Sequence, residues 1–113
     1  KGWELIAYND SREHKVRDEL DKHDVAKVLS RNWGRWLELL KEFSCKGLAF
    51  DEFPPVLIVH GDRDAVVWPE QVKYFTKALR KSQLAMWEGC GHAPHWHDPH
   101  ALKGLIRDFT QNV

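Results

Sequence analysis

The sequence predicts an α/β fold in which a short parallel sheet follows a segment of helices. Residues 56–59 (Val-Leu-Ile-Val) form a continuous aliphatic run, which is typical of a strand buried on both faces within a parallel sheet. From residue 55 onward the strand and helix patterns alternate twice, and this alternation indicates a right-handed parallel arrangement. Residues 9–53 carry helix signals instead, so we expect a small helical module ahead of the sheet.

At the N-terminus we expect a short strand followed by a charged helix. The apolar stretch within residues 1–8 is the candidate strand. A capping-box pattern at residues 10–13 then predicts the start of a helix. The stretch 11–21 is heavily charged, with Val16 and Leu20 as its apolar contacts, which indicates a solvated helix.

Two further helices are expected before the sheet begins. Asp24 can cap one of them and Asn32 can cap the other. Gly47 and the Pro54-Pro55 pair then interrupt the helical pattern. The helix after Asn32 carries aromatic and aliphatic side chains three and four residues apart: Trp33, Trp36, Leu37, Leu40 and Phe43.

The C-terminal half is expected to contain two strand–helix pairs. Gly61 ends the first strand, and Pro69 occupies the first turn of the helix that follows it. Residues 84–87 form a second short strand, after which the glycines of the 89–91 turn redirect the chain. Asp98-Pro99 is a strong helix start, because Asp caps the helix and Pro fits its first position. The apolar stripe of this last helix consists of Leu102, Leu105, Ile106, Phe109 and Val113.

The composition narrows the class of protein. The 113 residues are 42% hydrophobic and 30% charged, which is typical of a globular protein rather than a disordered one. Basic and acidic residues both number 17. A partner such as a nucleic acid or an anionic membrane would favour an excess of basic residues, and this sequence has none. No apolar run approaches the roughly 18 residues of a membrane span. Cys45 and Cys90 are too few for a disulfide scaffold, and a single bridge between them stays open. We expect free thiols in a reducing, cytoplasmic compartment instead.

Chemically active side chains follow both expected strands. The loop 60–67 offers carboxylates, and the loop 89–95 offers imidazoles. Because ligands bind at the carboxyl ends of parallel strands, these loops are expected to meet at one edge of the sheet. A carboxylate that faces a histidine N–H fixes the ring tautomer and stabilises the imidazolium formed during proton transfer. We expect His60, at the strand end, to be a hydrogen-bonded structural residue instead.

These loops resemble the last third of the α/β-hydrolase fold. The resemblance lies in three motifs: PVLIVHGDRD (55–64), WPEQ (68–71) and GHAPHW (91–96). It implies that Asp64, in the Gly-x-x-Asp turn after a strand, is the acid of a catalytic triad, and that His92, in the Gly-His turn, is its base. The expected division is a possible core strand at 1–8, a helical lid or cap at 9–53, and the C-terminal core of the hydrolase domain at 54–113.

The nucleophile of that family is missing from this sequence. The Gly-x-Ser-x-Gly motif does not occur, and none of the four serines is flanked by the required glycines. We therefore expect the nucleophile to lie in an N-terminal part of the same protein, which would be a partner of this segment. This chain alone is expected to be inactive. The four serines that lack the flanking glycines are Ser11, Ser30, Ser44 and Ser82.

The resemblance implies a hydrolase that acts on an ester, or on a related acyl or carbon–carbon bond, of a small apolar substrate. An upstream serine would attack, His92 would move the proton and Asp64 would orient His92, with no cofactor and no metal. The helical lid would close over the pocket. The candidate lining residues are Trp33, Trp36, Trp68 and Trp96, although ordinary packing is the usual fate of large aromatic side chains.

Several alternatives stay open at this point. Asp62 is a second candidate for the acid, although its position also suits a turn. Relatives with an aspartate nucleophile open epoxides or displace halide, and a non-catalytic binding protein on the same fold is a further alternative. The four histidines between residues 92 and 100 could hold zinc, but Pro94 and Pro99 exclude a helix-face motif such as His-Glu-x-x-His.

Overall fold

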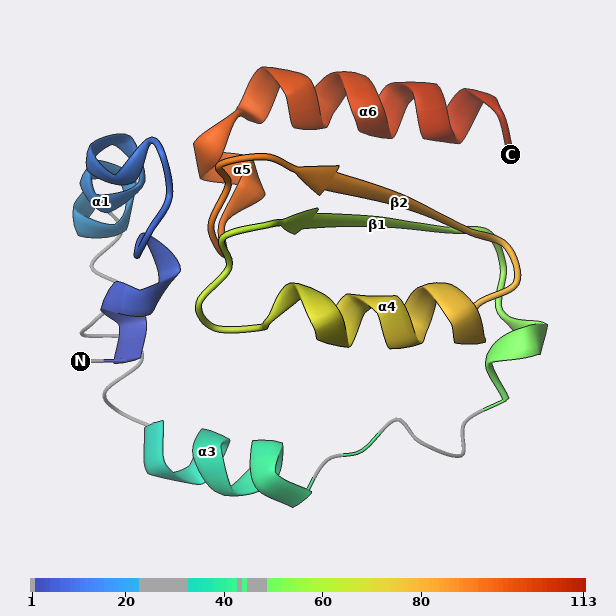
Figure 1. The fold of residues 1–113 in the computed structure, drawn as a ribbon, viewed down its shortest axis with the longest axis horizontal. Coiled ribbons are helices and arrows are strands. Elements are labelled where there is room, and N and C mark those ends of the chain that lie inside the picture. The colour runs from blue at the N-terminus through green and yellow to red at the C-terminus, as the bar shows by residue number, and fades with distance from the viewer. Residues whose placement is uncertain (1, 23–32, 43, 45–48) are drawn as a thin grey trace.

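The computed structural model describes residues 2–22, 33–42, 44 and 49–113 (Figure 1). The helix expected after Asp24 lies outside these residues, as does Cys45. In chain order the elements are η1 (Gly2–Ile6), α1 (Glu13–Lys22), α3 (Trp33–Glu42), η2 (Phe50–Glu52), β1 (Val56–Gly61), α4 (Pro69–Ala78), β2 (Ser82–Trp87), α5 (Pro94–His97) and α6 (Pro99–Gln111).

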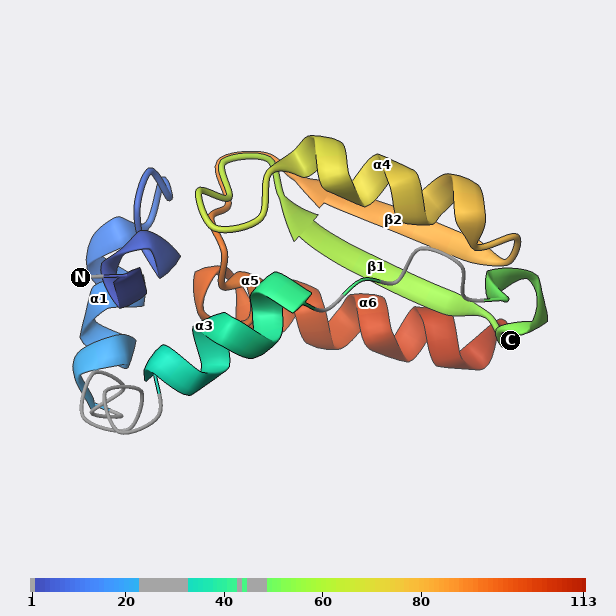
Figure 2. The ribbon, with the colours of Figure 1, turned by 90° about the horizontal axis from the view of Figure 1, so that it is seen from below.

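The strands β1 and β2 form a two-stranded parallel sheet. Its register runs from Val56 opposite Ser82 to Gly61 opposite Trp87, so the carboxyl ends of the strands emerge side by side. The helix α4 connects the strands and covers one face of the sheet, while α6 lies on the opposite face (Figures 1 and 2). Parallel strands joined by a helix and covered on both faces make an α/β fold, so the predicted fold class is confirmed.

The strand β1 is less buried than its aliphatic run indicates. Residues 56–60 are half-buried, and Gly61 alone is buried. In the described part of the chain each strand has a neighbour on one edge only, which leaves part of the aliphatic surface uncovered. A composition suited to a sheet interior therefore lies at a sheet edge.

Proline and aspartate set the helix starts in the C-terminal half. Pro69 and Pro99 occupy the first turns of α4 and α6, where the missing N–H is not needed. The Asp98 carboxylate caps α6 by accepting a hydrogen bond from Ala101 N at 3.0 Å. Pro94 opens α5, a single helical turn that the sequence did not predict. Proline disrupts the interior of a helix, but it suits the first position, which it occupies here.

The expectation of a strand within residues 1–8 is wrong for this structure. Gly2–Ile6 forms the 3-10 helix η1, and Ala7 N and Tyr8 N continue the local hydrogen bonding to carbonyl oxygens three residues earlier. A strand satisfies its backbone groups only beside another strand. The segment lies apart from β1 and β2 in both ribbon views, so its backbone closes hydrogen bonds locally (Figures 1 and 2).

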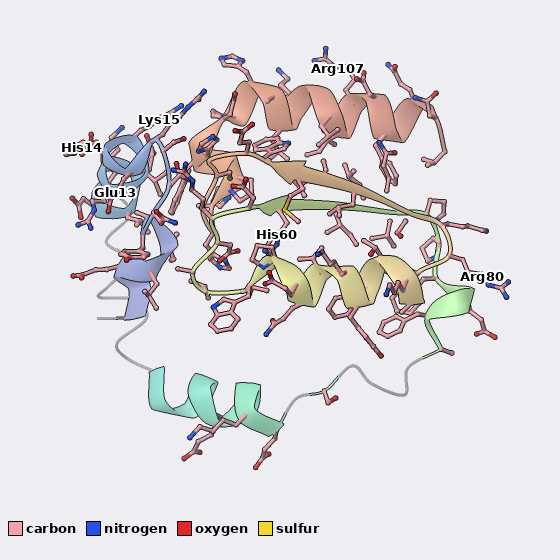
Figure 3. All side chains as sticks on the ribbon, in the orientation of Figure 1. Glu13, His14, Lys15, His60, Arg80 and Arg107 are labelled. Carbon is pink, nitrogen blue, oxygen red and sulfur yellow. The ribbon has the colours of Figure 1, made fainter. Side chains whose placement is uncertain are left out.

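A small core joins the N-terminal segment to the loop that follows β2. Val16 and Leu20 face this core from α1, as expected, while the side chains of Glu13 and His14 lie on the outer side of that helix (Figure 3). This arrangement confirms that α1 is a solvated helix with one apolar side. The core consists of Ala7, Val16, Leu20 and Ala93, with Ile6 and Trp96 packed against them.

The helix α3 confirms the helix predicted after Asn32, and it stands away from the strands (Figure 1). Of its described side chains, Arg35, Glu38 and Leu39 are exposed. No helix in the described ranges has both the length and the apolar character needed to cross a lipid bilayer.

Candidate active site

The candidate site lies where the loops after β1 and β2 meet. Asp62 N donates to Trp87 O at 3.0 Å, and Arg63 N donates to Cys90 O at 2.9 Å. The Asp62 carboxylate adds a third link by accepting from Gly89 N at 2.8 Å. The two loops are thus held together as the parallel strands predict, and Asp62 acts as the turn residue that joins them.

Two glycines allow this close approach. Gly61 ends β1, and a Cβ at this position would overlap the carbonyl oxygens of both Cys90 and Gly91. Gly89 has a φ of 74°, a left-handed conformation that side chains disfavour, and a Cβ there would lie 2.8 Å from Ser11 Oγ. Gly61 therefore permits the contact between the loops, and Gly89 permits the turn.

Asp64 and His92 form a hydrogen-bonded pair across the two loops. His92 Nδ1 lies 2.9 Å from Asp64 Oδ2, and because an ionised carboxylate can only accept, Nδ1 is the donor. Asp64 Oδ1 accepts from Val66 N at 2.8 Å and from Val67 N at 2.9 Å. The Asp64 side chain is 2% exposed and that of His92 is 35% exposed. The carboxylate is therefore buried and fixed, while the imidazole reaches the surface.

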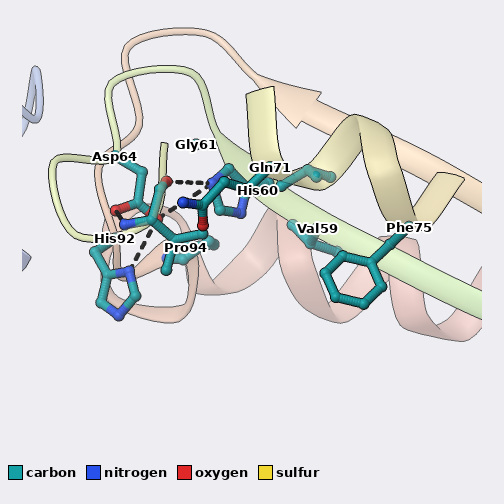
Figure 4. A pocket seen from close by; sticks show the side chains of 10 residues that line it. Val59, His60, Gly61, Asp64, Gln71, Phe75, His92 and Pro94 are labelled. Atoms are coloured by element: carbon teal, nitrogen blue, oxygen red, sulfur yellow. Dashed lines mark hydrogen bonds and ion pairs between the residues drawn. The ribbon is translucent and has the colours of Figure 1, made fainter. Parts of the chain in front are cut away.

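His60 contacts the same carboxylate from β1. Its Nε2 lies 2.9 Å from Val67 O and 3.3 Å from Asp64 Oδ2, and both partners are acceptors, so Nε2 carries the hydrogen. Figure 4 shows these contacts gathered around Asp64, with the imidazole of His92 beside it. His60 thus has the hydrogen-bonded position that the sequence predicted, and it also helps to hold Asp64.

A cavity of about 300 Å³ opens beside the pair (Figure 4). Its polar side chains, which include Asp64 and His92, lie near one end, and much of the remaining wall is apolar. Such a cavity is typical of a site for a small ligand. The lining residues are Val59, His60, Gly61, Asp64, Val67, Gln71, Val72, Phe75, His92 and Pro94.

Of the four tryptophans expected to line the pocket, Trp68 and Trp96 have described side chains, and neither lines this cavity. Trp68 precedes α4 and is 66% exposed, because its side chain leaves the helix start toward solvent. Trp96 packs against the small core, and its helix α5 contacts α1. The structure therefore places neither Trp68 nor Trp96 in the wall of this cavity. The side chains of Trp33 and Trp36 lie outside what the structure describes.

The neighbouring histidine His95 differs from His92 in its surroundings. Its ring lies against Trp96, with the ring centroids 4.7 Å apart. Partial burial, and then the proximity of His92, lower the pKa of His95 below its usual value. Both effects favour the neutral form of the His95 ring.

A second buried cluster, which no sequence pattern indicated, lies behind the loop that carries His92. Asp10 Oδ1 accepts from His97 Nδ1 and from Arg12 N, both at 2.7 Å, and Asp10 Oδ2 accepts from Gly91 N at 2.6 Å. Asp10 and His97 are 87 positions apart, so no local spacing could have revealed the pair. The cluster includes Cys90, where burial first, and nearby aspartates second, raise the pKa of the thiol to about 12.

The cluster of Asp10, Cys90 and His97 contains side chains of the kinds that bind metal ions. The candidate ligand atoms of Asp10, Cys90 and His97 lie within 4.8 Å of one another, and they form the one such group among the described residues. Hydrogen bonds already engage both Asp10 oxygens and His97 Nδ1, and the thiol would have to lose its proton before binding a metal. The zinc alternative based on the histidines of 92–100 gains no support, because His92 and His97 point to different carboxylates.

Comparisons with known proteins agree with the fold. The family model for TAP-like proteins matches residues 42–112. A pimeloyl-[acyl-carrier protein] methyl ester esterase from Aromatoleum aromaticum is 32% identical over 95% of this chain and 44% of its own length. The esterase of the same name from Neisseria meningitidis serogroup A is 37% identical over 52% of this chain and 19% of its own length. Bifunctional epoxide hydrolase 2 from Mus musculus is 30% identical over 71% of this chain and 14% of its own length. No solved structure matches this chain.

A strand–helix–strand unit with an aspartate and a histidine at the carboxyl ends of its parallel strands is a feature of the α/β hydrolases. The chain belongs to the α/β-hydrolase superfamily, in which the TAP-like family model matches it over more than half of its length. The resemblance drawn from the three motifs is thereby confirmed. The chain spans less than half the length of each relative described above.

Proposed function

We propose that this chain supplies the acid and the general base of an ester hydrolase, Asp64 and His92, and that the nucleophile belongs to another part of the polypeptide. The observation that carries the proposal is the 2.9 Å hydrogen bond from His92 Nδ1 to a buried carboxylate beside a cavity. The names of the bacterial relatives, which are methyl ester esterases, support the choice of an ester as substrate.

In the proposed reaction, His92 Nε2 takes the proton of a serine hydroxyl while the serine oxygen attacks the ester carbonyl carbon. The carbonyl–oxygen bond of the ester then breaks, and the alcohol leaves with that proton. Water hydrolyses the acyl-enzyme in the same way and releases the carboxylic acid. Asp64 stabilises the imidazolium in both halves, and the hydrogen bonds from Val66 N and Val67 N keep the carboxylate directed at His92.

The cavity favours a small substrate with an apolar group. Val59, Val72 and Phe75 form apolar parts of its wall, and its volume of about 300 Å³ suits a short acyl or alkyl chain. A methyl ester, the kind of substrate named for the bacterial relatives, is compatible with these dimensions. We propose in addition that residues 9–53 act as a lid over this cavity.

The proposal is tested with a fluorophosphonate probe, which labels an activated serine, on the full-length protein that contains this chain. We expect stoichiometric labelling of the wild type. His92→Ala should slow labelling by at least about 1,000-fold, because the base is removed. His95→Ala, the matched control, should label within about twofold of the wild-type rate. Equal labelling of the His92→Ala variant and the wild type would refute the proposed role of His92.

An epoxide hydrolase is a second candidate, favoured by the likeness to the Mus musculus protein over 71% of this chain. An aspartate nucleophile would form an alkyl ester with the substrate and would not react with a fluorophosphonate. Hydrolysis of styrene oxide by the full-length protein, without fluorophosphonate labelling, would therefore favour this candidate over the serine hydrolase.

A further inference from the structure

The backbone of the loop that carries His92 is held by the N-terminal segment 6–11. Gly91 N donates to the carboxylate of Asp10 at 2.6 Å. The next amide along the loop, His92 N, donates to Ile6 O at 3.3 Å. Two consecutive amides of the His92 loop thus find their acceptors in one segment that is far away in sequence.

Asp10 also holds the turn that follows this loop. Its Oδ1 accepts from His97 Nδ1 at 2.7 Å, and His97 closes the short helix α5. Arg12 N donates to the same oxygen at 2.7 Å, so three donors converge on one carboxylate, and the Asp10 side chain is 0% exposed. Ser11 N adds a contact at the start of the loop by donating to Gly89 O at 2.8 Å.

We propose that Asp10 is a positioning residue for His92. It fixes the backbone before His92 through Gly91 N and the helical turn after it through His97. This inference rests on the proposed function, because it assigns Asp10 the task of placing the general base. Asp10 touches His92 only through the backbone of the loop, so its effect on the reaction is indirect.

The physical need for such a residue follows from the composition of the loop. Gly89 and Gly91 give the loop more backbone freedom than other residues would. Asp64 fixes the tautomer and rotation of the His92 ring but leaves the path of the backbone to other contacts. Displacing a catalytic group by about 1 Å can cost on the order of 100-fold in rate. Asp10 opposes that displacement with a buried, charge-assisted hydrogen bond.

The test uses Asp10→Asn in the full-length protein. An amide offers an acceptor at one end only, so at least one of the donors on Asp10 loses its partner. With the fluorophosphonate probe, we expect the rate constant per labelled site to fall by about 10- to 100-fold. The final stoichiometry should stay near that of the wild type. The low-field proton NMR signal of His92 Nδ1–H should also shift or broaden, because the ring moves relative to Asp64.

A purely structural role would give a different result. Fewer molecules would then label, while each folded molecule would react at the wild-type rate, and this result would overturn the proposal. Asp98→Asn is the matched control, because it removes an aspartate that caps α6 and not one that holds the His92 loop. It should keep its rate constant within about twofold of wild type. If it slowed labelling as much as Asp10→Asn, general loosening of this end of the molecule would explain both, and the proposal would fail.

Two further measurements separate the possible failures. If Asp64→Asn labels at the wild-type rate, the proposed function fails, and the role of Asp10 fails with it. If Asp64→Asn is slow and Asp10→Asn reacts normally, only the role of Asp10 fails. If Asp10→Asn does not fold, hydrogen exchange of the Gly91 amide in the wild-type protein tests the proposal instead. We expect slow exchange, because Gly91 N donates to Asp10. Exchange as fast as in an open loop would overturn the proposal.

Discussion

At the scale of single residues, two aspartates of the same loop have different surroundings. Asp62 is exposed and accepts from Gly89 N, whereas Asp64 is buried beside His92. The sequence left both open as the acid on chemical grounds, and only the resemblance favoured Asp64. Spacing could not decide, because a tight turn sends two carboxylates that are two residues apart in different directions.

Exchanging these aspartates for asparagine tests the assignment. We expect Asp64→Asn to lower the catalytic rate of the full-length protein by about 1,000- to 10,000-fold, because an amide cannot stabilise the imidazolium and favours the wrong tautomer. Asp62→Asn keeps a side-chain oxygen that can accept from Gly89 N and should lose less than about tenfold. Steady-state hydrolysis of p-nitrophenyl acetate measures both, and the reverse order of the two losses would make Asp62 the acid.

The buried thiol of Cys90 gives a prediction that does not depend on catalysis. Its pKa of about 12 leaves about one thiol in ten thousand ionised at pH 8, and burial restricts access further. We expect Cys90 to resist iodoacetamide at pH 8 in the folded full-length protein and to react once urea unfolds it. Mass spectrometry of the Cys90 peptide gives the readout, and equal labelling in both states would contradict the burial of this residue.

At the scale of elements, the strands and helices of the C-terminal half were predictable because local signals agree there. The aliphatic run of β1, the prolines that open α4 and α6, and the glycines of the loops each indicated the element that forms. Residues 1–8 could not be assigned in the same way. Apolar composition suits a strand or a helix, and the choice depends on whether a neighbouring strand is available to pair with.

The close contact between the loops that follow β1 and β2 predicts that a side chain at Gly61 is destabilising. Gly61→Ala should destabilise the full-length protein by about 1–3 kcal/mol, because the added methyl group overlaps the carbonyls of Cys90 and Gly91. Gly104→Ala is the control: this position lies within α6 with open space around it, and alanine should stabilise by about 0.5–1 kcal/mol. Urea unfolding measures both, and a neutral Gly61→Ala would mean that the loops are further apart.

At the scale of the whole molecule, the described part of the chain exposes surfaces that usually pack against other structure. Its sheet has two strands, α6 buries none of its residues fully, and Leu84 and Ile106 are 38% and 47% exposed. Sheet edges and apolar patches of this kind promote association. The sequence indicated the α/β class of the molecule, but how its outer faces are covered depends on contacts between distant parts of a structure.

We therefore expect the 113-residue chain, produced by itself, to self-associate and to melt without a sharp transition. Light scattering coupled to gel filtration gives the mass, and circular dichroism gives the melting curve. Ile106→Lys should raise the monomer fraction, because it places a charge on the exposed stripe of α6. A monomer with a sharp, cooperative melt would show that these surfaces need no further covering.

The proposed function requires that Asp64 act on the reaction through His92, and a double-mutant cycle in the full-length protein is its sharpest test. The rates of ester hydrolysis are measured for the wild type, for Asp64→Asn, for His92→Ala and for the double variant. If the two residues work as one unit, the double variant is no slower than His92→Ala alone. If the two losses multiply instead, Asp64 contributes independently of His92, and the acid–base pair described here is not the catalytic unit.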